Sequence, residues 1–140
     1  MQEKTKGPSV LIVDDEPDNL KMLVKVLTDA GYQIWPALNG EKALIIVEKY
    51  PPDIVLLDIN MPGMDGYEVC RRLKNDKKTI DIPVVFLSCL EELNDKLKGF
   101  DAGAVDYITK PFRVEEVLAG VRVHTRLYRE KILRDRKSVV

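Results

Sequence analysis

Short apolar segments alternate with amphipathic segments along the chain, and this alternation restricts the fold more than any other feature. The apolar segments have the length of strands and lie at residues 10–13, 32–38, 54–57, 82–88 and 104–109. Most are rich in Val, Ile and Leu without polar alternation, which is typical of strands buried on both faces. The pattern therefore predicts an α/β protein with an open parallel sheet and right-handed crossovers.

Helical spacing of apolar residues fills the intervals between these strands. The first predicted helix runs through Leu20, Leu23 and Leu27 and is closed by Gly31. The others are predicted at about residues 39–50, 65–75, 91–100 and from 114 onwards. Five strands and five helices in strict alternation predict helices on both faces of the sheet.

Composition excludes few functions but limits the setting. A chain of 140 residues is about one domain, and its formal charge of -1 gives no general reason to bind nucleic acid or a membrane. The amino terminus lacks the apolar stretch of a signal peptide, and no apolar run approaches the roughly 18 residues of a membrane span. We therefore expect a cytoplasmic protein that does not insert into membranes.

Polar side chains follow the predicted strands where the apolar runs stop. The first strand ends at Asp14 and Asp15, the third at Asp58, the fourth at Ser88 and the fifth at Lys110. Ligands of open parallel sheets bind at this carboxyl edge, so these side chains are expected to converge. Taken singly, most have ordinary explanations, such as capping of the helix at Pro17 or surface exposure. Capping does not explain Asp58, which follows a doubly buried strand.

Electrostatics indicates what such a cluster would bind. Two carboxylates about 5 Å apart at an effective dielectric constant near 20 repel by about 3 kcal/mol, and one lysine cannot offset three of them. Oxygen ligands from carboxylates and a carbonyl suit Mg²⁺, whose partners are commonly phosphates. The residues therefore predict a site where a phosphoryl group approaches an anionic nucleophile.

The same positions resemble the receiver domain of two-component response regulators, of the chemotaxis-receiver type. The resemblance rests on "LIVDDEPDNL", "DIVLLDINMPGMDGYEVCRRLK", "IPVVFLS" and "GFDAGAVDYITKPF", in the family's order and spacing. It implies a flavodoxin-like three-layer fold with strand order 2-1-3-4-5. On this basis we expect a receiver domain at 8–125, a disordered tail at 1–7, and an extended carboxyl-terminal helix or linker at 126–140.

The resemblance also implies roles for single residues. Asp58 would be the phosphoacceptor, Asp15 a direct Mg²⁺ ligand, Asp14 the holder of metal-bound water, and the Asn60 carbonyl a further ligand. Lys110 would pair with Asp58 and then with the phosphoryl group. The two switch residues would be Ser88, which bonds the phosphoryl group, and Tyr107, which changes rotamer. The Lys110–Pro111 bond resembles the family's cis peptide.

The implied function is phosphotransfer signalling in a bacterial two-component system. A sensor histidine kinase or phosphotransfer protein would donate the phosphoryl group, and the face of helix 4, strand 5 and helix 5 would change. The domain would catalyse only its own phosphorylation and dephosphorylation, without being an enzyme. The alternatives are a phosphorylation-independent pseudo-receiver scaffold and a Mg²⁺-dependent phosphohydrolase of the haloacid dehalogenase type. The latter needs a second carboxylate where this chain has Asn60.

Two departures from the family lie beside Ser88. Cys89 is larger than the usual residue and could narrow access of the phosphoryl group, whereas Leu90 is apolar where a polar side chain could orient water. From Leu90 we predict slow autodephosphorylation.

The last helix carries a seam of residues three and four apart, at Leu118, Val121, Thr125, Tyr128 and Ile132. Such a seam allows a homodimer through this helix or the output face, although the first half must also pack on the sheet. Beyond residue 121 the chain has seven basic and two acidic side chains, which favours complementing the helix dipole over binding nucleic acid. His124 is predicted to be a surface histidine.

Overall fold

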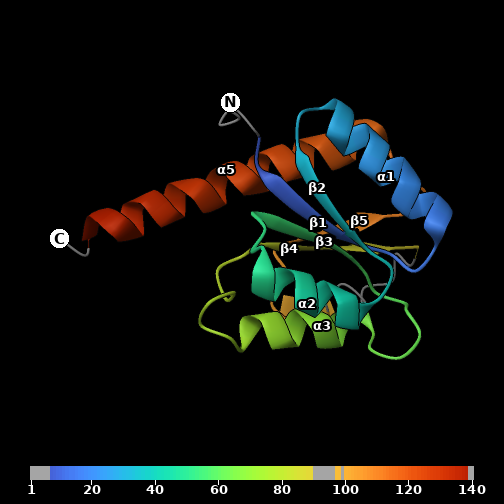
Figure 1. The fold of residues 1–140 in the computed structure, drawn as a ribbon, viewed down its shortest axis with the longest axis horizontal. Coiled ribbons are helices and arrows are strands. Elements are labelled where there is room, and N and C mark those ends of the chain that lie inside the picture. The colour runs from blue at the N-terminus through green and yellow to red at the C-terminus, as the bar shows by residue number, and fades with distance from the viewer. Residues whose placement is uncertain (1–6, 90–96, 99, 139–140) are drawn as a thin grey trace.

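The strands form one parallel sheet in a computed structural model that describes residues 7–89, 97–98 and 100–138. The sheet order is β2-β1-β3-β4-β5, which confirms the predicted class and topology (Figure 1). The strands are β1 (Ser9–Val13), β2 (Gln33–Ala37), β3 (Ile54–Asp58), β4 (Val84–Ser88) and β5 (Asp106–Thr109).

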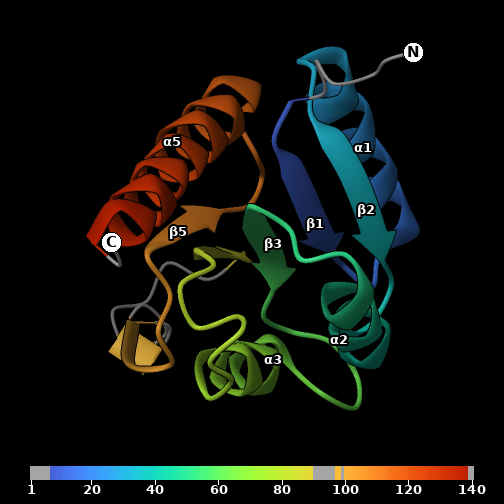
Figure 2. The same ribbon diagram turned by 60° about the vertical axis from the view of Figure 1, so that its left-hand side comes forward.

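Helices cover both faces of this sheet. Helices α1 (Pro17–Asp29) and α5 (Val114–Ser138) lie on one face, and α2 (Gly40–Lys49) and α3 (Gly66–Lys74) lie on the other (Figures 1 and 2). Of the helix predicted at 91–100, only residues 97, 98 and 100 are described, and these are helical. The predicted tail at 1–7 lies, apart from Gly7, outside the described residues.

The continuous apolar runs are explained by a core on each side of the sheet. In β3, Ile54 and Leu56 pack with α1 and α5, whereas Val55 and Leu57 pack with α2 and α3. Successive side chains of a strand point to opposite faces, so a sheet covered on both faces needs apolar residues at every position. Residues 54–58 of β3 are all buried, and the only charged one among them is Asp58.

The register places the two buried aspartates side by side. Val13 of β1 lies opposite Leu57 of β3, so Asp14 and Asp58 both emerge where their strands end. β1 and β3 are neighbours in the sheet. The chain goes from β1 to β2 on one side of this pair and from β3 to β4 on the other side, so the strand order reverses between β1 and β3. Ligand sites of open parallel sheets form at this reversal, at the carboxyl ends of the strands.

Helix α5 begins beyond the carboxyl end of β5 and projects past the sheet at its far end (Figure 1). Val117, Val121 and Thr125 are buried, so the first part of the predicted seam packs on the chain's own sheet. Self-association through the helix would therefore have to use residues outside this buried part. Among the residues whose structure is described, none of the helices combines the length and hydropathy required to cross a membrane.

Candidate functional site

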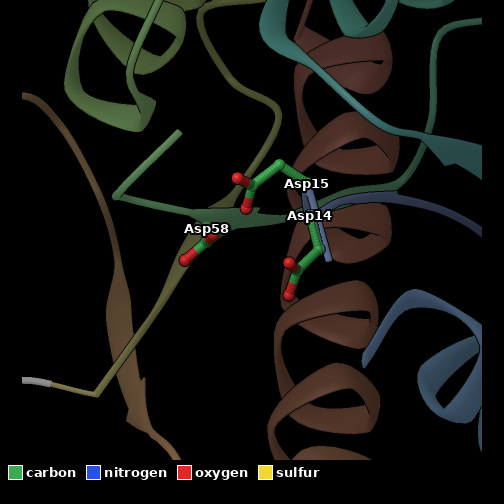
Figure 3. A group of neighbouring side chains, drawn as sticks. All are labelled: Asp14, Asp15 and Asp58. Atoms are coloured by element: carbon green, nitrogen blue, oxygen red, sulfur yellow. The ribbon is translucent and has the colours of Figure 1, made fainter. Parts of the chain in front are cut away.

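Three aspartates meet at the carboxyl edge of the sheet. Carboxylate oxygens of Asp14, Asp15 and Asp58 lie within 4.8 Å of one another (Figure 3). Asp14 and Asp58 are buried, with exposed fractions of 0% and 4%, and Asp15 is partly exposed. The convergence predicted from the strand ends is therefore observed.

Lys110 supplies the cation of this cluster. Its Nζ lies 3.3 Å from Asp58 Oδ1 and 3.4 Å from Asp14 Oδ2. The backbone positions the side chain, because the amide of Lys110 donates to the carbonyl of Ser88, with an N–O distance of 2.6 Å. The Lys110–Pro111 peptide is cis, as predicted.

Burial and charge shift the protonation equilibria of this pair. Burial, with a smaller contribution from Asp14, raises the pKa of Asp58 to about 6, although Lys110 acts in the opposite direction. Burial disfavours the Lys110 ammonium, but Asp58 and Asp14 outweigh it and raise the pKa of Lys110. With all four groups ionised the cluster carries two excess negative charges, which a divalent cation would neutralise.

The capping explanation for the acidic pair is wrong. The N-cap of α1 is Glu16, whose side chain makes no capping hydrogen bond, and Pro17 begins the helix. Instead, Asp14 Oδ1 accepts a hydrogen bond from the backbone amide of Glu16 at 2.9 Å. This bond fixes the turn after β1 and leaves Asp14 Oδ2 facing Lys110.

The loop after Asp58 contains a close approach that sequence reasoning missed. The N-cap of α3 is Asp65, which accepts from Glu68 N at 3.0 Å, so Asp58 has no capping role. A Cβ on Gly66 would lie 2.3 Å from the carbonyl oxygen of Asp58 and 2.9 Å from Ile59 Cα. Only glycine allows α3 to pack this closely on the end of β3. The signal available in the sequence was a glycine directly after a capping aspartate.

The remaining predicted residues that the structure describes lie on or just beyond β3, β4 and β5. Ser88 is 1% exposed and ends β4, the strand beside Asp58. Tyr107 lies two positions before the end of β5, and its hydroxyl is buried. Its ring packs edge-on against the ring of Phe86, with 6.4 Å between the ring centroids. Asn60 is exposed just beyond β3. Cys89 is exposed, whereas Leu90 lies outside the described residues.

The prediction of a surface histidine at position 124 is wrong. The side chain of His124 is only 17% exposed, and its Nε2 lies 3.0 Å from Asp106 Oδ2 on β5. Sequence reasoning missed this pair because its members are 18 residues apart and join only when α5 packs on the sheet.

Comparison with known proteins agrees with this geometry. The sequence model of the family described as "Response regulator receiver domain" matches residues 10–122 of this chain. The chain is 45% identical over 115 residues to the DNA-binding dual master transcriptional regulator RpaA of Synechocystis, covering 82% of this chain and 48% of the relative. It is 43% identical to the response regulator PleD of Caulobacter vibrioides, covering 84% of this chain and 26% of that protein.

Solved structures give the same result. The chemotaxis protein CheY4 of Vibrio cholerae superposes with a TM-score of 0.79 at 30% identity, covering 82% of this chain and 96% of that one. The chain spans about half or less of the length of RpaA and PleD, so the match concerns one domain of those proteins. This chain belongs to the receiver domain family of response regulators.

Proposed function

We propose that Asp58 accepts a phosphoryl group from a phosphohistidine on a sensor histidine kinase or phosphotransfer protein. The observation that carries this proposal is a nearly buried carboxylate, 4% exposed, held beside a second buried carboxylate and contacted by one lysine. Isolated buried charges are costly, and a structural ion pair would not need the additional acidic groups. The excess charge is explained if the site binds a cation together with a phosphoryl group.

The donor set fits Mg²⁺. Asp14, Asp15 and Asp58 supply carboxylate oxygens, and the backbone carbonyl of Asn60 would complete the protein ligands, with Asp14 acting through bound water. When bound, the ion would neutralise charge on the phosphoryl oxygens. The carboxylates can serve this role only when deprotonated, so the raised pKa of Asp58 sets proton and metal in competition.

The chain's own residues divide the transfer among them. A carboxylate oxygen of Asp58 attacks phosphorus, and the bond to the donor's imidazole nitrogen breaks, with its electron pair leaving on the imidazole. Lys110 leaves its contact with Asp58 to pair with a phosphoryl oxygen, and the Ser88 hydroxyl donates to another. Hydrolysis of the acyl phosphate later restores the carboxylate.

Phosphorylation would act as a switch through Ser88 and Tyr107. Movement of the Ser88 hydroxyl towards the phosphoryl group would alter the space available to Tyr107, one strand away. This would change the face formed by β5, α5 and the helix expected at 91–100, most of which lies outside the described residues. Three further expectations remain predictions: a receiver domain that spans residues 8–125, a cytoplasmic location, and slow dephosphorylation.

The test is Mg²⁺-dependent labelling with a radioactive small phosphodonor such as acetyl phosphate. We expect label that is released by base and by hydroxylamine on the wild type, none on Asp58→Asn, and unchanged label on Asp29→Asn, whose exposed carboxylate pairs with Lys25 on α1. An unlabelled wild type would indicate a pseudo-receiver scaffold. Phosphate release so fast that little label accumulates on Asp58 would indicate a phosphohydrolase.

A further inference from the structure

The segment between β5 and α5 places an aromatic ring beside the lysine of the aspartate cluster. The Lys110 ammonium lies over the ring of Phe112, with 5.8 Å between Nζ and the ring centroid. A cation within about 6 Å of the centroid is attracted by the negative face of an aromatic ring. The ring is thus a third contact of this ammonium, in addition to Asp58 and Asp14.

The two carboxylate contacts of Lys110 are long. The distances from Nζ, 3.3 Å to Asp58 and 3.4 Å to Asp14, exceed the roughly 2.7–2.9 Å that is typical of hydrogen bonds between an ammonium and a carboxylate. Among the residues that the structure describes, Asp14 Oδ2 has no hydrogen-bond partner, so its contact with Lys110 is electrostatic only. The ammonium therefore lies between the two carboxylates without being fixed by either.

The core holds the Phe112 ring in place. The ring packs against the buried residues on the α1 and α5 face of the sheet, which include Leu20 of α1 and Val117 of α5. The Lys110 side chain is only 17% exposed, so little water competes with the ring for the ammonium. Attraction between a cation and a ring is stronger where water is excluded, and a ring packed against a core is restricted in its movement. The contact is therefore suited to positioning the ammonium.

The ring also differs from the carboxylates in what happens to it during phosphotransfer. Asp14 and Asp58 belong to the proposed donor set for Mg²⁺, and the carboxylate charge of Asp58 is lost when the acyl phosphate forms. Both changes weaken the attraction of the carboxylates for Lys110. The ring takes part in neither change, and a cation is attracted to its whole face. The ammonium can therefore turn from Asp58 to a phosphoryl oxygen while it stays against the ring.

We propose that Phe112 is a positioning residue for phosphotransfer, and that the face of its ring holds the Lys110 ammonium at the phosphoryl site. The inference rests on the proposed function, because Lys110 is the residue that pairs with the phosphoryl group. Phe112 acts through Lys110, without contact with the phosphoryl group. A ring that only filled space would be replaced without loss by any side chain of the same shape.

The test changes the charge distribution of the ring while it keeps the shape. Phenylalanine analogues with one, two and three fluorine atoms are introduced at position 112, since fluorine withdraws electron density from the ring face and is nearly as small as hydrogen. The rate constant of Mg²⁺-dependent phosphorylation by radioactive acetyl phosphate should fall stepwise along this series, by about threefold to tenfold with three fluorine atoms. Phe112→Leu should be slowed to a similar extent. Phe112→Tyr, which retains the ring, should restore most of the rate.

The matched control is Tyr50→Leu, which removes a ring far from the cluster. Tyr50 lies in the turn between α2 and β3, at the amino edge of the sheet, opposite the aspartates, and stacks on Trp35 with 4.4 Å between the ring centroids. This variant should be phosphorylated as fast as the wild type. Equal rates along the fluorine series, even with a slow Phe112→Leu, would show that the ring only fills space and would contradict the inference.

A second measurement needs no phosphorylation. Protons over the face of an aromatic ring resonate upfield, so NMR should find the Hε protons of Lys110 upfield in the wild type and shifted downfield in Phe112→Leu. They should stay upfield in Asp58→Asn, because the ring continues to hold the ammonium. A downfield shift in Asp58→Asn, with normal labelling of the wild type, contradicts this inference alone. A wild type that takes no phosphoryl label contradicts the proposed function and, with it, the role of Phe112 in transfer.

Discussion

The two edges of the sheet carry similar residues in opposite electrostatic situations. At the carboxyl edge, Asp14 and Asp58 are buried and both contact Lys110, and Asp15 adds a third carboxylate to the cluster without an ion pair among the described contacts. At the amino edge, Asp53, Asp81 and Asp106 each have a basic partner on α5 and are at least partly exposed.

The difference separates charges that function from charges that support the fold. Paired carboxylates near the surface stabilise a structure weakly, since solvent screens them. Buried carboxylates in excess destabilise it until a ligand arrives, and such strain is typical of binding sites. The changes in the free energy of unfolding caused by substitutions at the two edges should therefore differ in sign as well as in size.

The largest change in stability is expected from Gly66→Ala, which disrupts the packing at the carboxyl edge of the sheet. The new Cβ would meet the Asp58 carbonyl at 2.3 Å, so α3 or the end of β3 must move. We expect a loss of about 3 kcal/mol in the free energy of unfolding, measured by urea denaturation. In the control Gly120→Ala, the Cβ meets only Ile108 Cδ1 at 3.6 Å, and its helical position predicts a gain of up to about 1 kcal/mol. Equal effects of the two substitutions would contradict the close approach.

Asp58→Asn should stabilise the metal-free protein at neutral pH. A carboxyl group whose pKa is raised to about 6 binds its proton more tightly in the folded than in the unfolded chain. Its contribution to stability is present below the unfolded value near 4 and is lost as the pH rises through about 6. Removing the charge should thus add about 1–2 kcal/mol at pH 7.5 and little at pH 4.

The amino edge provides the matched comparison. Asp53→Asn removes a carboxylate that accepts from Ser9 and Arg129, so it should lower the free energy of unfolding by up to about 1 kcal/mol. Chemical denaturation of both variants across this pH range compares the two signs. If Asp58→Asn were destabilising at pH 7.5, the description of an under-neutralised site would be wrong.

Magnesium affinity should fall as the pH falls through about 6. Protonated Asp58 is not a metal ligand, so one competing proton predicts about tenfold weaker binding at pH 5 than at pH 7. Isothermal titration calorimetry with Mg²⁺ measures this, and Asp76→Asn, which alters an aspartate in the turn after α3, serves as the control. A pH-independent affinity would exclude Asp58 from the ligand set.

The smallest effect concerns the Arg129–Asp53 pair. The side chains are 52% and 23% exposed, and a double-mutant cycle with alanine should give a coupling energy of about 0.2–1 kcal/mol. The coupling should decrease when salt is raised from 0.05 M to 0.5 M. Coupling that persists in high salt would indicate a desolvated pair, unlike the one described here.

Local sequence determined most of the fold. The runs at 10–13 and 54–57 specified doubly buried strands because their residues are apolar at every position, and Asn39 and Asp65 began α2 and α3 where their side chains accept backbone amides. The ends of the strands also indicated Asp14, Asp15, Asp58 and Lys110, since parallel strands bring their carboxyl ends to one edge. The strand order itself came from the family resemblance, because alternation alone leaves several orders open.

Only the tertiary structure decided which charges pair and how closely elements approach. The sequence predicts His124 as a surface residue, but in the fold α5 packs so that this side chain lies beside Asp106. The sequence also predicts Val121 and Thr125 as part of a seam for self-association, but both are buried against the chain's own sheet. Gly66 follows the capping residue Asp65, but that local pattern does not show that the end of β3 lies against it, and a Cβ there would lie 2.3 Å from the Asp58 carbonyl oxygen. Patterns in a sequence report the periodicity of one segment, whereas burial, pairing and pKa depend on distances between segments that only packing fixes.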